Sequence, residues 1–205
     1  YSLVFAFWTG SVIIDSDGLS HAFYTGHNGS LSPKEAIMHA TSKDGVKWSK
    51  QPEHTFFASA QYEADDFRDP FVFYEEDSQE YWMLITARQN GTGVIARYTS
   101  TDLITWEDQG TFFVNDFGND SNLECPSLVY FEGKWYLAFS DQWDKRVVHY
   151  RIADSVNGPF VKPTNLDHWD GSGFYAGRLE TDGEKLYVMG WIPTKEQPRD
   201  NQNYD

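Results

Sequence analysis

What the sequence lacks already limits the classes of protein to which it can belong. Cys125 is the only cysteine among 205 residues, so no disulfide can form within the chain. No run of about 18 apolar residues occurs, so no membrane-spanning helix is expected. Basic residues are few: 16 Lys and Arg stand against 31 Asp and Glu, giving a net charge of −15. Such a chain repels phosphate backbones and anionic membranes, so we expect neither nucleic acid nor a membrane as a partner.

Several chemical signatures are also missing. The sequence has no glycine-rich phosphate loop, no Gly-x-Ser-x-Gly elbow and no Cys-x-x-Cys pair. Its six histidines show no metal-ligand spacing, and His39 and His149 are expected to be core or turn residues. The sequence therefore implies no cofactor and no metal. A neutral ligand such as a carbohydrate remains compatible with the acidic charge.

Aromatic residues, in contrast, are abundant, at 17% of the chain. Flat rings stack on the C–H faces of sugars, but aromatic residues also favour strands and fill cores. Short strand-like runs recur in three stretches that begin near residues 11, 69 and 125, and a fourth, partial copy begins at Gly177. The repeat advances by roughly 55 residues, with turn signals such as Asp44-Gly45 between its strands.

This repeat predicts the fold. Three or four short strands per unit, repeated at this length, are typical of a β-propeller, whereas a β-sandwich shows similar strands without such a period. We therefore predict an all-β, five-bladed β-propeller, of which about three and a half blades lie in this chain. Residues 1–205 are expected to form part of a single propeller catalytic domain whose N-terminal blade is missing. Tyr1 is not an initiator Met, which supports a chain cut from something longer.

Two acidic motifs lie one repeat apart, Arg68-Asp69-Pro70 and Glu124-Cys125-Pro126. Each opens a strand-like run, and each is predicted to place a carboxylate at the same point of its repeat. In a propeller the first strands of all blades lie near the central axis, so we expect both carboxylates to face one pocket. Two carboxylates are what glycoside hydrolysis requires. Taken alone, Asp69 also fits a structural Asp–Arg turn, and Glu124 fits a solvent-exposed strand end.

The pair of motifs, in this order and at this spacing, resembles glycoside hydrolase family 32, the β-fructosidases that include invertases, inulinases and levanases. The run Phe7-Trp8-Thr9-Gly10-Ser11 resembles a third element of that family, and Phe174-Tyr175-Ala176 resembles a fourth. The resemblance covers nearly the whole chain. It implies a five-bladed propeller, a carbohydrate substrate and a retaining mechanism on β-fructofuranosidic bonds in sucrose, inulin, levan or fructo-oligosaccharides.

The resemblance also implies roles for individual residues. Glu124 is the expected acid/base, and Asp69 is the expected stabiliser of the transition state. Arg68, Trp8 and Thr9 are expected to contact the sugar, with threonine standing where the family usually has serine. Substrate-binding roles are also expected for two further aromatic residues, Trp143 and Tyr175.

One departure from the family is large. The family's nucleophile is an aspartate in an Asn-Asp-Pro-like motif, and no such motif occurs here. We expect it N-terminal to this chain, in the rest of a longer polypeptide, so the 205 residues alone should be inactive. The family's propeller is often followed by a β-sandwich, so the resemblance also implies a C-terminal β-sandwich in that polypeptide. Two alternatives stay open. One is a catalytically inactive carbohydrate-binding propeller, and the other is a related five-bladed hydrolase acting on arabinose or xylose units.

Overall fold

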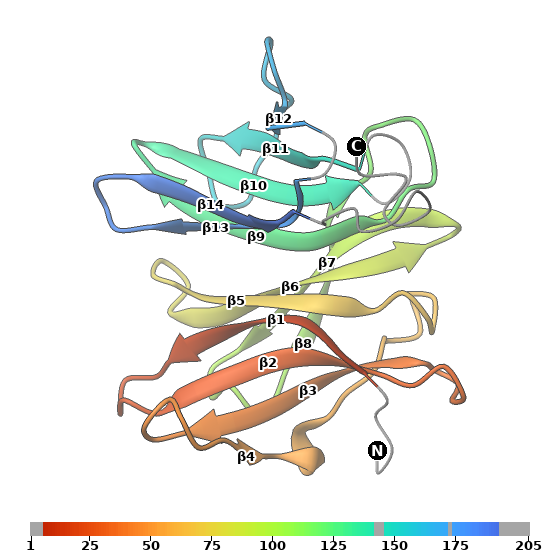
Figure 1. The fold of residues 1–205 in the computed structure, drawn as a ribbon, viewed down its shortest axis with the longest axis vertical. Coiled ribbons are helices and arrows are strands. Elements are labelled where there is room, and N and C mark those ends of the chain that lie inside the picture. The colour runs from red at the N-terminus through yellow and green to blue at the C-terminus, as the bar shows by residue number, and fades with distance from the viewer. Residues whose placement is uncertain (1–5, 142–145, 172–173, 193–205) are drawn as a thin grey trace. The chain divides into compact units, whose positions relative to one another are not determined.

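A computed structural model describes residues 6–141, 146–171 and 174–192, and it consists almost entirely of β-strands (Figure 1). The one helical element among these residues is a short 3₁₀ helix, η1 (Pro52–His54). In the described part of the chain, no helix is long and apolar enough to cross a membrane. The chain divides into two compact units, residues 1–114 and 115–205, and each is described by itself.

The first unit contains two antiparallel sheets in which strands follow one another in sequence order. The first sheet (red to orange in Figure 1) comprises β1 (Ala6–Ile14), β2 (Ser20–His27), β3 (Glu35–Ser42) and β4 (Ser49–Lys50). The second sheet comprises β5 (Arg68–Glu75), β6 (Glu80–Gln89), β7 (Thr92–Ser100) and β8 (Glu107–Val114). Two consecutive four-stranded sheets are what the sequence repeat predicts.

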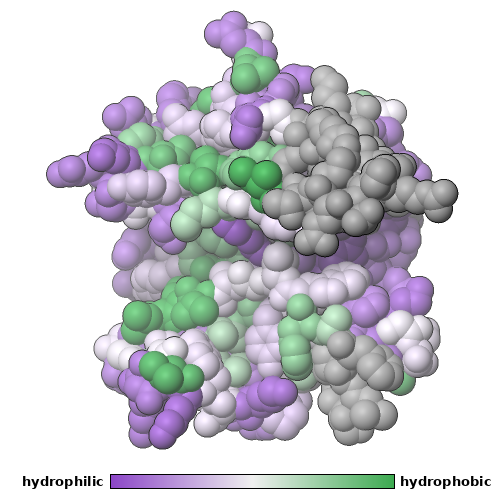
Figure 2. Space-filling view, in the orientation of Figure 1, coloured by the Kyte–Doolittle hydropathy of each residue, from purple (hydrophilic) through white to green (hydrophobic). Residues whose placement is uncertain are grey.

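The second unit repeats the pattern with one complete sheet and one pair of strands. The third sheet comprises β9 (Leu123–Phe131), β10 (Lys134–Asp141), β11 (Val148–Ala153) and β12 (His168–Trp169). The last described strands, β13 (Tyr175–Thr181) and β14 (Leu186–Trp191), form an antiparallel hairpin. Figure 2 shows hydrophilic residues at the tip of this hairpin, where residues 182–185 are exposed to solvent.

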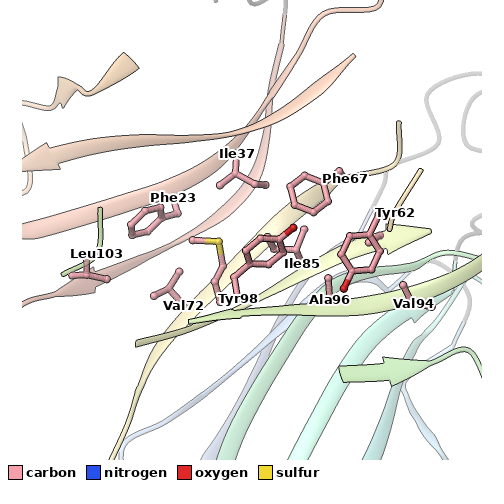
Figure 3. Packing of buried hydrophobic residues seen from close by; sticks show 12 residues of the cluster. Phe23, Ile37, Tyr62, Phe67, Val72, Ile85, Val94, Ala96, Tyr98 and Leu103 are labelled. Carbon is pink, nitrogen blue, oxygen red and sulfur yellow. The ribbon is translucent and has the colours of Figure 1, made fainter. Parts of the chain in front are cut away.

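The two sheets of the first unit are joined by an apolar core. Phe23 and Ile37 from the first sheet lie in one buried cluster with Val72 and Ile85 from the second (Figure 3). The Ser11 Oγ atom on β1 also accepts the Val72 N–H group on β5, at 2.9 Å. Truncation of such a buried side chain to alanine costs about 2–5 kcal/mol, so this core holds β1 and β5 in a fixed relation.

The second unit uses the same plan with a smaller core. Val129, Ala138, Val148 and Leu179 form its buried cluster, so residues from β9, β10 and β11 pack against β13. The Leu179 N–H group donates to Ser127 Oγ at 3.1 Å, which matches the bond between Val72 and Ser11 in the first unit. The recurrence of this bond shows that the two units are built from the same repeat.

One turn recurs with the same hydrogen bonds in residues 42–48 and 100–106. In each copy the serine Oγ accepts the N–H group three positions on, at 2.9 Å, and the aspartate Oδ1 accepts two more. The residue after the aspartate has φ of 68° at Gly45 and 60° at Leu103. Glycine adopts this conformation at little cost. Leu103 adopts it because its side chain is buried in the core of the first unit.

The first strands of three sheets are interrupted by a β-bulge at the same place. In β5 three residue steps, from Arg68 to Phe71, oppose two steps on β6, and the same shift occurs in β9 and β13. The residue at the bulge has a positive φ in each case: Asp69, Cys125 and Ala176. A non-glycine residue rarely adopts this conformation, and such residues concentrate at functional sites. Strand β1 also shifts register, between Phe7 and Gly10, without a positive φ.

Candidate active site

The bulges correct one expectation from the sequence. In strand register, Glu124 is equivalent to Arg68, since each is the last paired residue before its bulge. Asp69 is equivalent to Cys125, which has the positive φ in the second motif. The two carboxylates therefore do not occupy the same point of the repeat but are offset by one residue. The reason is that the bulge inserts an unpaired residue, which the acid occupies in one motif and the cysteine in the other.

Asp69 is buried, and hydroxyl groups surround it. Thr9 Oγ1 donates to Oδ1, and Thr86 Oγ1 donates to Oδ2 at 3.4 Å. The Asp69 N–H group, which the bulge leaves outside the β5–β6 ladder, donates to Thr25 Oγ1 at 2.8 Å. Three elements, β1, β2 and β6, thus fix this residue. We refer to Asp69, Arg68, Thr9, Thr25 and Thr86 as the Asp69 cluster.

Arg68 contacts two acids, Glu35 and Asp66, in addition to its neighbour Asp69. Its Nη1 atom lies 2.6 Å from Asp66 Oδ1 and 3.2 Å from Glu35 Oε2, whereas its Nε atom lies 4.0 Å from Asp69 Oδ2. Burial raises the pKa of the Glu35 carboxyl, and the Arg68 charge counteracts that rise. The guanidinium is thus held by Glu35 and Asp66 and lies at ion-pair range from Asp69, while its predicted contact with the sugar stays a prediction.

Trp8 and Thr9, the predicted sugar contacts of β1, both lie at the Asp69 cluster. Thr9 keeps the hydroxyl that the resemblance requires and uses it on Asp69. The Trp8 ring stacks on His27, with ring centroids 4.2 Å apart, and the Arg68 guanidinium lies 5.8 Å from it. Trp8 is nevertheless 42% exposed, which is a large fraction for an aromatic residue held on two sides. An anchored and accessible ring of this kind is suited to stacking on a ligand.

Glu124, in the second unit, is held differently. It is half-buried, and Tyr175 Oη donates to its Oε2 atom. Burial, and then the charge of Glu124, raise the pKa of Tyr175 well above its usual range, so the phenol remains a neutral donor. The Arg146 guanidinium lies 4.7 Å from the Tyr175 ring centroid. We refer to Glu124, Tyr175 and Arg146 as the Glu124 cluster. Tyr175, predicted as a sugar contact, contacts the predicted acid.

The bulge of β13 has a support that matches the one at Asp69. The Ala176 N–H group donates to Ser140 Oγ at 3.0 Å, as Asp69 N–H donates to Thr25. Ser140 is itself paired with Glu124 in the β9–β10 register. In both cases a hydroxyl on the second strand of one sheet therefore accepts a hydrogen bond from the N–H group at the bulge of the next sheet.

A network of charged residues lies beside the Glu124 cluster. The His149 ring nitrogens lie 2.8 Å from Asp141 Oδ2 and 3.2 Å from Asp167 Oδ2, so a carboxylate holds the ring on each side. Asp141 Oδ1 also accepts the Arg146 N–H group at 2.9 Å. Through this bond the network positions the backbone that carries Arg146.

The same region contains the group of described residues whose spacing could hold a metal ion: His149, Asp167 and His168. Asp167, however, already forms ion pairs with Arg151 at 3.1 Å and with Lys162 at 3.3 Å. Two cations on the same carboxylate oppose a third. The chemistry of the donor set therefore fits a structural ion network rather than a metal centre.

Trp143, the remaining predicted sugar contact, lies outside the described residues. Four supporting residues were not predicted from the sequence: Thr25, Thr86, Glu35 and Arg146. A signal for the hydroxyls was available, because a threonine or serine recurs near the end of the second strand of each of the first three repeats, at Thr25, Thr86 and Ser140. No comparable pattern marks Glu35.

The comparison with known families is decisive. The model of the glycosyl hydrolases family 32 N-terminal domain matches residues 4–205. The chain belongs to glycosyl hydrolase family 32. Among curated family 32 relatives, the levanbiose-producing levanase of Geobacillus stearothermophilus is 26% identical over 181 residues, covering 80% of this chain and 39% of the relative. The sucrose-6-phosphate hydrolase of Staphylococcus xylosus is 27% identical over 202 residues, covering 90% of this chain and 40% of the relative.

Solved family 32 structures agree. The Bombyx mori β-fructofuranosidase BmSUC1 superposes with a TM-score of 0.75 at 25% identity, covering 93% of this chain and 44% of that one. The all-β propeller predicted from the sequence is confirmed. The family 32 chain described here spans about two fifths of the length of these relatives.

Proposed function

We propose that the protein carrying this chain hydrolyses β-fructofuranosidic bonds by a retaining, two-carboxylate mechanism, with sucrose, inulin, levan or fructo-oligosaccharides as its substrate class. The observation that carries the proposal is the family 32 match over residues 4–205, which includes both acidic motifs. The hydrogen bonds to Asp69 and Glu124 support it. Each carboxylate accepts hydrogen bonds from hydroxyl donors, which a solvent-exposed carboxylate at a strand end would lack.

Glu124 is the proposed acid/base. In the first step its carboxyl donates a proton to the leaving glycosidic oxygen, and in the second it removes a proton from the attacking water. Its partial exposure allows this exchange. After proton donation the carboxylate is negative, and the hydrogen bond from Tyr175 then stabilises that charge.

Asp69 is the proposed transition-state stabiliser. A carboxylate fixed by Thr9 and Thr86 need not reorganise as positive charge develops on the sugar ring, which is the condition for effective electrostatic stabilisation. Trp8 and Arg68 are the proposed sugar contacts of this cluster, and Trp143 keeps its predicted role at the substrate. Tyr175 also keeps its predicted role at the substrate and in addition donates a hydrogen bond to Glu124.

A retaining mechanism also needs a nucleophilic carboxylate. Asp65 and Asp66 precede Asp69, but Asp65 pairs with Lys34 and Asp66 with Arg68. No Asn-Asp-Pro motif occurs in the sequence. We therefore propose that the nucleophile belongs to the longer protein, that these 205 residues are one part of its propeller catalytic domain, and that they are inactive by themselves.

The test is a leaving-group experiment on the full-length protein. Glu124→Gln should abolish release of fructose from sucrose and inulin but still form the fructosyl-enzyme from an aryl β-fructofuranoside, whose good leaving group needs no proton, and hydrolyse that intermediate slowly. Added azide should restore turnover of the aryl substrate through a fructosyl azide of retained configuration. Glu132→Gln, at an exposed turn that follows β9, is the matched control and should change nothing.

Two results would contradict the proposal. If the wild-type protein releases no fructose from any of these sugars, the hydrolase function is wrong and a binding role replaces it. If Glu124→Gln keeps full activity on sucrose, the assignment of the acid/base is wrong.

A further inference from the structure

A hollow in the first unit lies away from Asp69. It has a volume of about 540 Å³ and is formed where β1 and β5 end and the β5–β6 hairpin turns. Pockets of this size commonly hold small ligands. Its lining residues are Ile14, Asp15, Ser16, Tyr74, Gln79, Tyr81 and Thr101.

The strand directions separate this hollow from the Asp69 cluster. Thr9 bonds Asp69, and Ser11 bonds Val72, so β1 and β5 run in the same direction side by side. Both strands carry the Asp69 cluster near their beginnings and the hollow at their ends. The five residue steps from Asp69 to Tyr74 span roughly 16 Å at the rise of a β-strand. A ligand in the hollow is therefore distinct from a sugar bound at Asp69.

Two tyrosines provide an accessible aromatic surface in the hollow. Tyr74 and Tyr81 are directly paired across β5 and β6, with ring centroids 5.0 Å apart and planes at 64°. Tyr74 is 41% exposed. Because the rings support each other in an edge-to-face arrangement, Tyr74 can present a surface to a ligand without first being ordered.

The polar groups of the hollow suit a polyol. Asp15 is oriented by the N–H groups of Asp17 and Leu19 on Oδ1 and by His21 at 3.1 Å from Oδ2. Around it, the side chains of Ser16, Gln79 and Thr101 make no hydrogen bond to any described residue. They offer hydroxyl and amide groups to a ligand. The lining contains one carboxylate and no cationic side chain, which disfavours an anionic ligand.

We infer that this hollow, the tyrosine pocket, is a second carbohydrate site that binds a neutral saccharide by stacking on Tyr74 and by hydrogen bonds to Asp15, Gln79 and Thr101. The site holds sugar without cleaving it, because the lining has only one carboxylate where glycoside hydrolysis uses two. Our choice of a fructan as the probe rests on the proposed function. The binding itself does not.

The experiment titrates a fructan tetrasaccharide into the full-length Glu124→Gln protein, in which turnover of the natural sugar is blocked, and follows heat and ligand NMR signals. Two binding events are expected. Tyr74→Ala should weaken one of them about fivefold or more, a loss of about 1 kcal/mol. Asp69→Ala should remove the other. In the protein with Glu124 intact, Tyr74→Ala should raise KM for long inulin and leave sucrose hydrolysis unchanged.

Two variants guard against indirect effects. Gln79→Gly removes the amide at a residue with φ of 56°, a conformation that glycine adopts readily, so it should weaken the same event without unfolding the hairpin. Tyr130→Ala is the matched control, because Tyr130 forms the equivalent exposed ring pair with Trp135 on β9 and β10, at 5.3 Å. It should leave both events intact.

The outcomes separate this inference from the proposed function. A single binding event that Asp69→Ala removes and Tyr74→Ala does not touch overturns the tyrosine pocket and leaves the hydrolase intact. An event lost in Tyr74→Ala, in a protein that hydrolyses no fructoside, supports the pocket and overturns the hydrolase. Absence of any saccharide binding overturns the tyrosine pocket, and fructose release by the wild-type protein then decides the hydrolase separately.

Discussion

The Asp69 cluster and the Glu124 cluster start from the same backbone device and hold their acids in different ways. Asp69 lies on the bulge, is buried, and is fixed by side chains from three strands. Glu124 lies one residue before its bulge, is half-buried, and has a hydrogen bond from Tyr175. The difference matches the two proposed roles, because a stabilising charge must not move, whereas an acid/base must exchange protons with leaving group and water.

The largest expected effect comes from removing the fixed charge. Asp69→Asn keeps an oxygen for Thr9 but loses the negative charge, and we expect kcat to fall about 10²–10³-fold. The fall should be similar on sucrose and on an aryl fructoside, because a stabiliser acts on the sugar whatever the leaving group. Asp65→Asn, which changes the acid of the exposed ion pair with Lys34, is the control. If the aryl substrate rescues Asp69→Asn as it rescues Glu124→Gln, the two clusters do not have separate roles.

The next largest effect should come from lowering the pH, which should destabilise the first unit before the second. In the first unit His39 lies between His21 and His54, at 2.9 Å from each. Burial, and then the charges of these neighbours, lower the pKa of His39 to about 4. Between pH 6.5 and 4 the unfolded chain binds more protons than the folded one. The stability is therefore complete above pH 6.5 and falls by up to about 3 kcal/mol towards pH 4.

In the second unit the pKa shift has a different consequence, because stability is lost only at lower pH. The pKa of Asp167 is lowered, because its neighbours, His149 first, outweigh the burial that would raise it. Its contribution to stability is present above about pH 3.8 and is lost only as the pH falls further. Hydrogen exchange at pH 7, 5.5 and 4.5 should therefore show β2 and β3 losing protection before β10 and β11. His39→Gln should remove the difference; equal loss in both units would contradict it.

A smaller effect should follow removal of the Tyr175 hydroxyl. Tyr175→Phe leaves the ring beneath Arg146 but removes the donor to the Glu124 carboxylate. We expect kcat to fall about tenfold, within the range for a hydrogen bond to a charged group. The fall should be smaller on an aryl fructoside, whose leaving group needs no proton from Glu124. An equal fall on both substrates would assign Tyr175 a purely structural role.

The smallest expected effect tests whether the bulge supports are equivalent. Thr25→Val and Ser140→Ala each remove the hydroxyl that accepts an N–H group at a bulge. Each should lower the free energy of unfolding by about 1 kcal/mol, since a buried or half-buried N–H group loses its acceptor. Urea denaturation measures both. A loss for Thr25→Val alone would mean that only the Asp69 bulge depends on its hydroxyl.

Sequence patterns predicted the repeat, the strands and both acidic motifs, because strand periodicity and turn chemistry are local. They did not predict that Arg68 pairs with Glu35, or that Thr25 binds the Asp69 N–H group. These contacts join neighbouring sheets across some 30 to 45 residues of sequence. The one-residue offset between Asp69 and Glu124 was also missed, since a bulge depends on the partner strand. That both acids act on one bond stays a prediction.

The bulges also divide each strand into a part whose side chains vary and a part whose packing is constant. Side chains of a regular strand alternate between faces, so a change of register at one end would carry through to the other. An extra residue resets that phase. The residues up to the bulge in β5, β9 and β13, namely Arg68, Glu124 and Tyr175, differ completely in chemistry. The residues after it keep the same bonds to the neighbouring sheet, as Val72 and Leu179 do. The part of the strand after the bulge is thus constant, and the part before it is variable. The same strand can therefore present a guanidinium, a carboxyl or a phenol group.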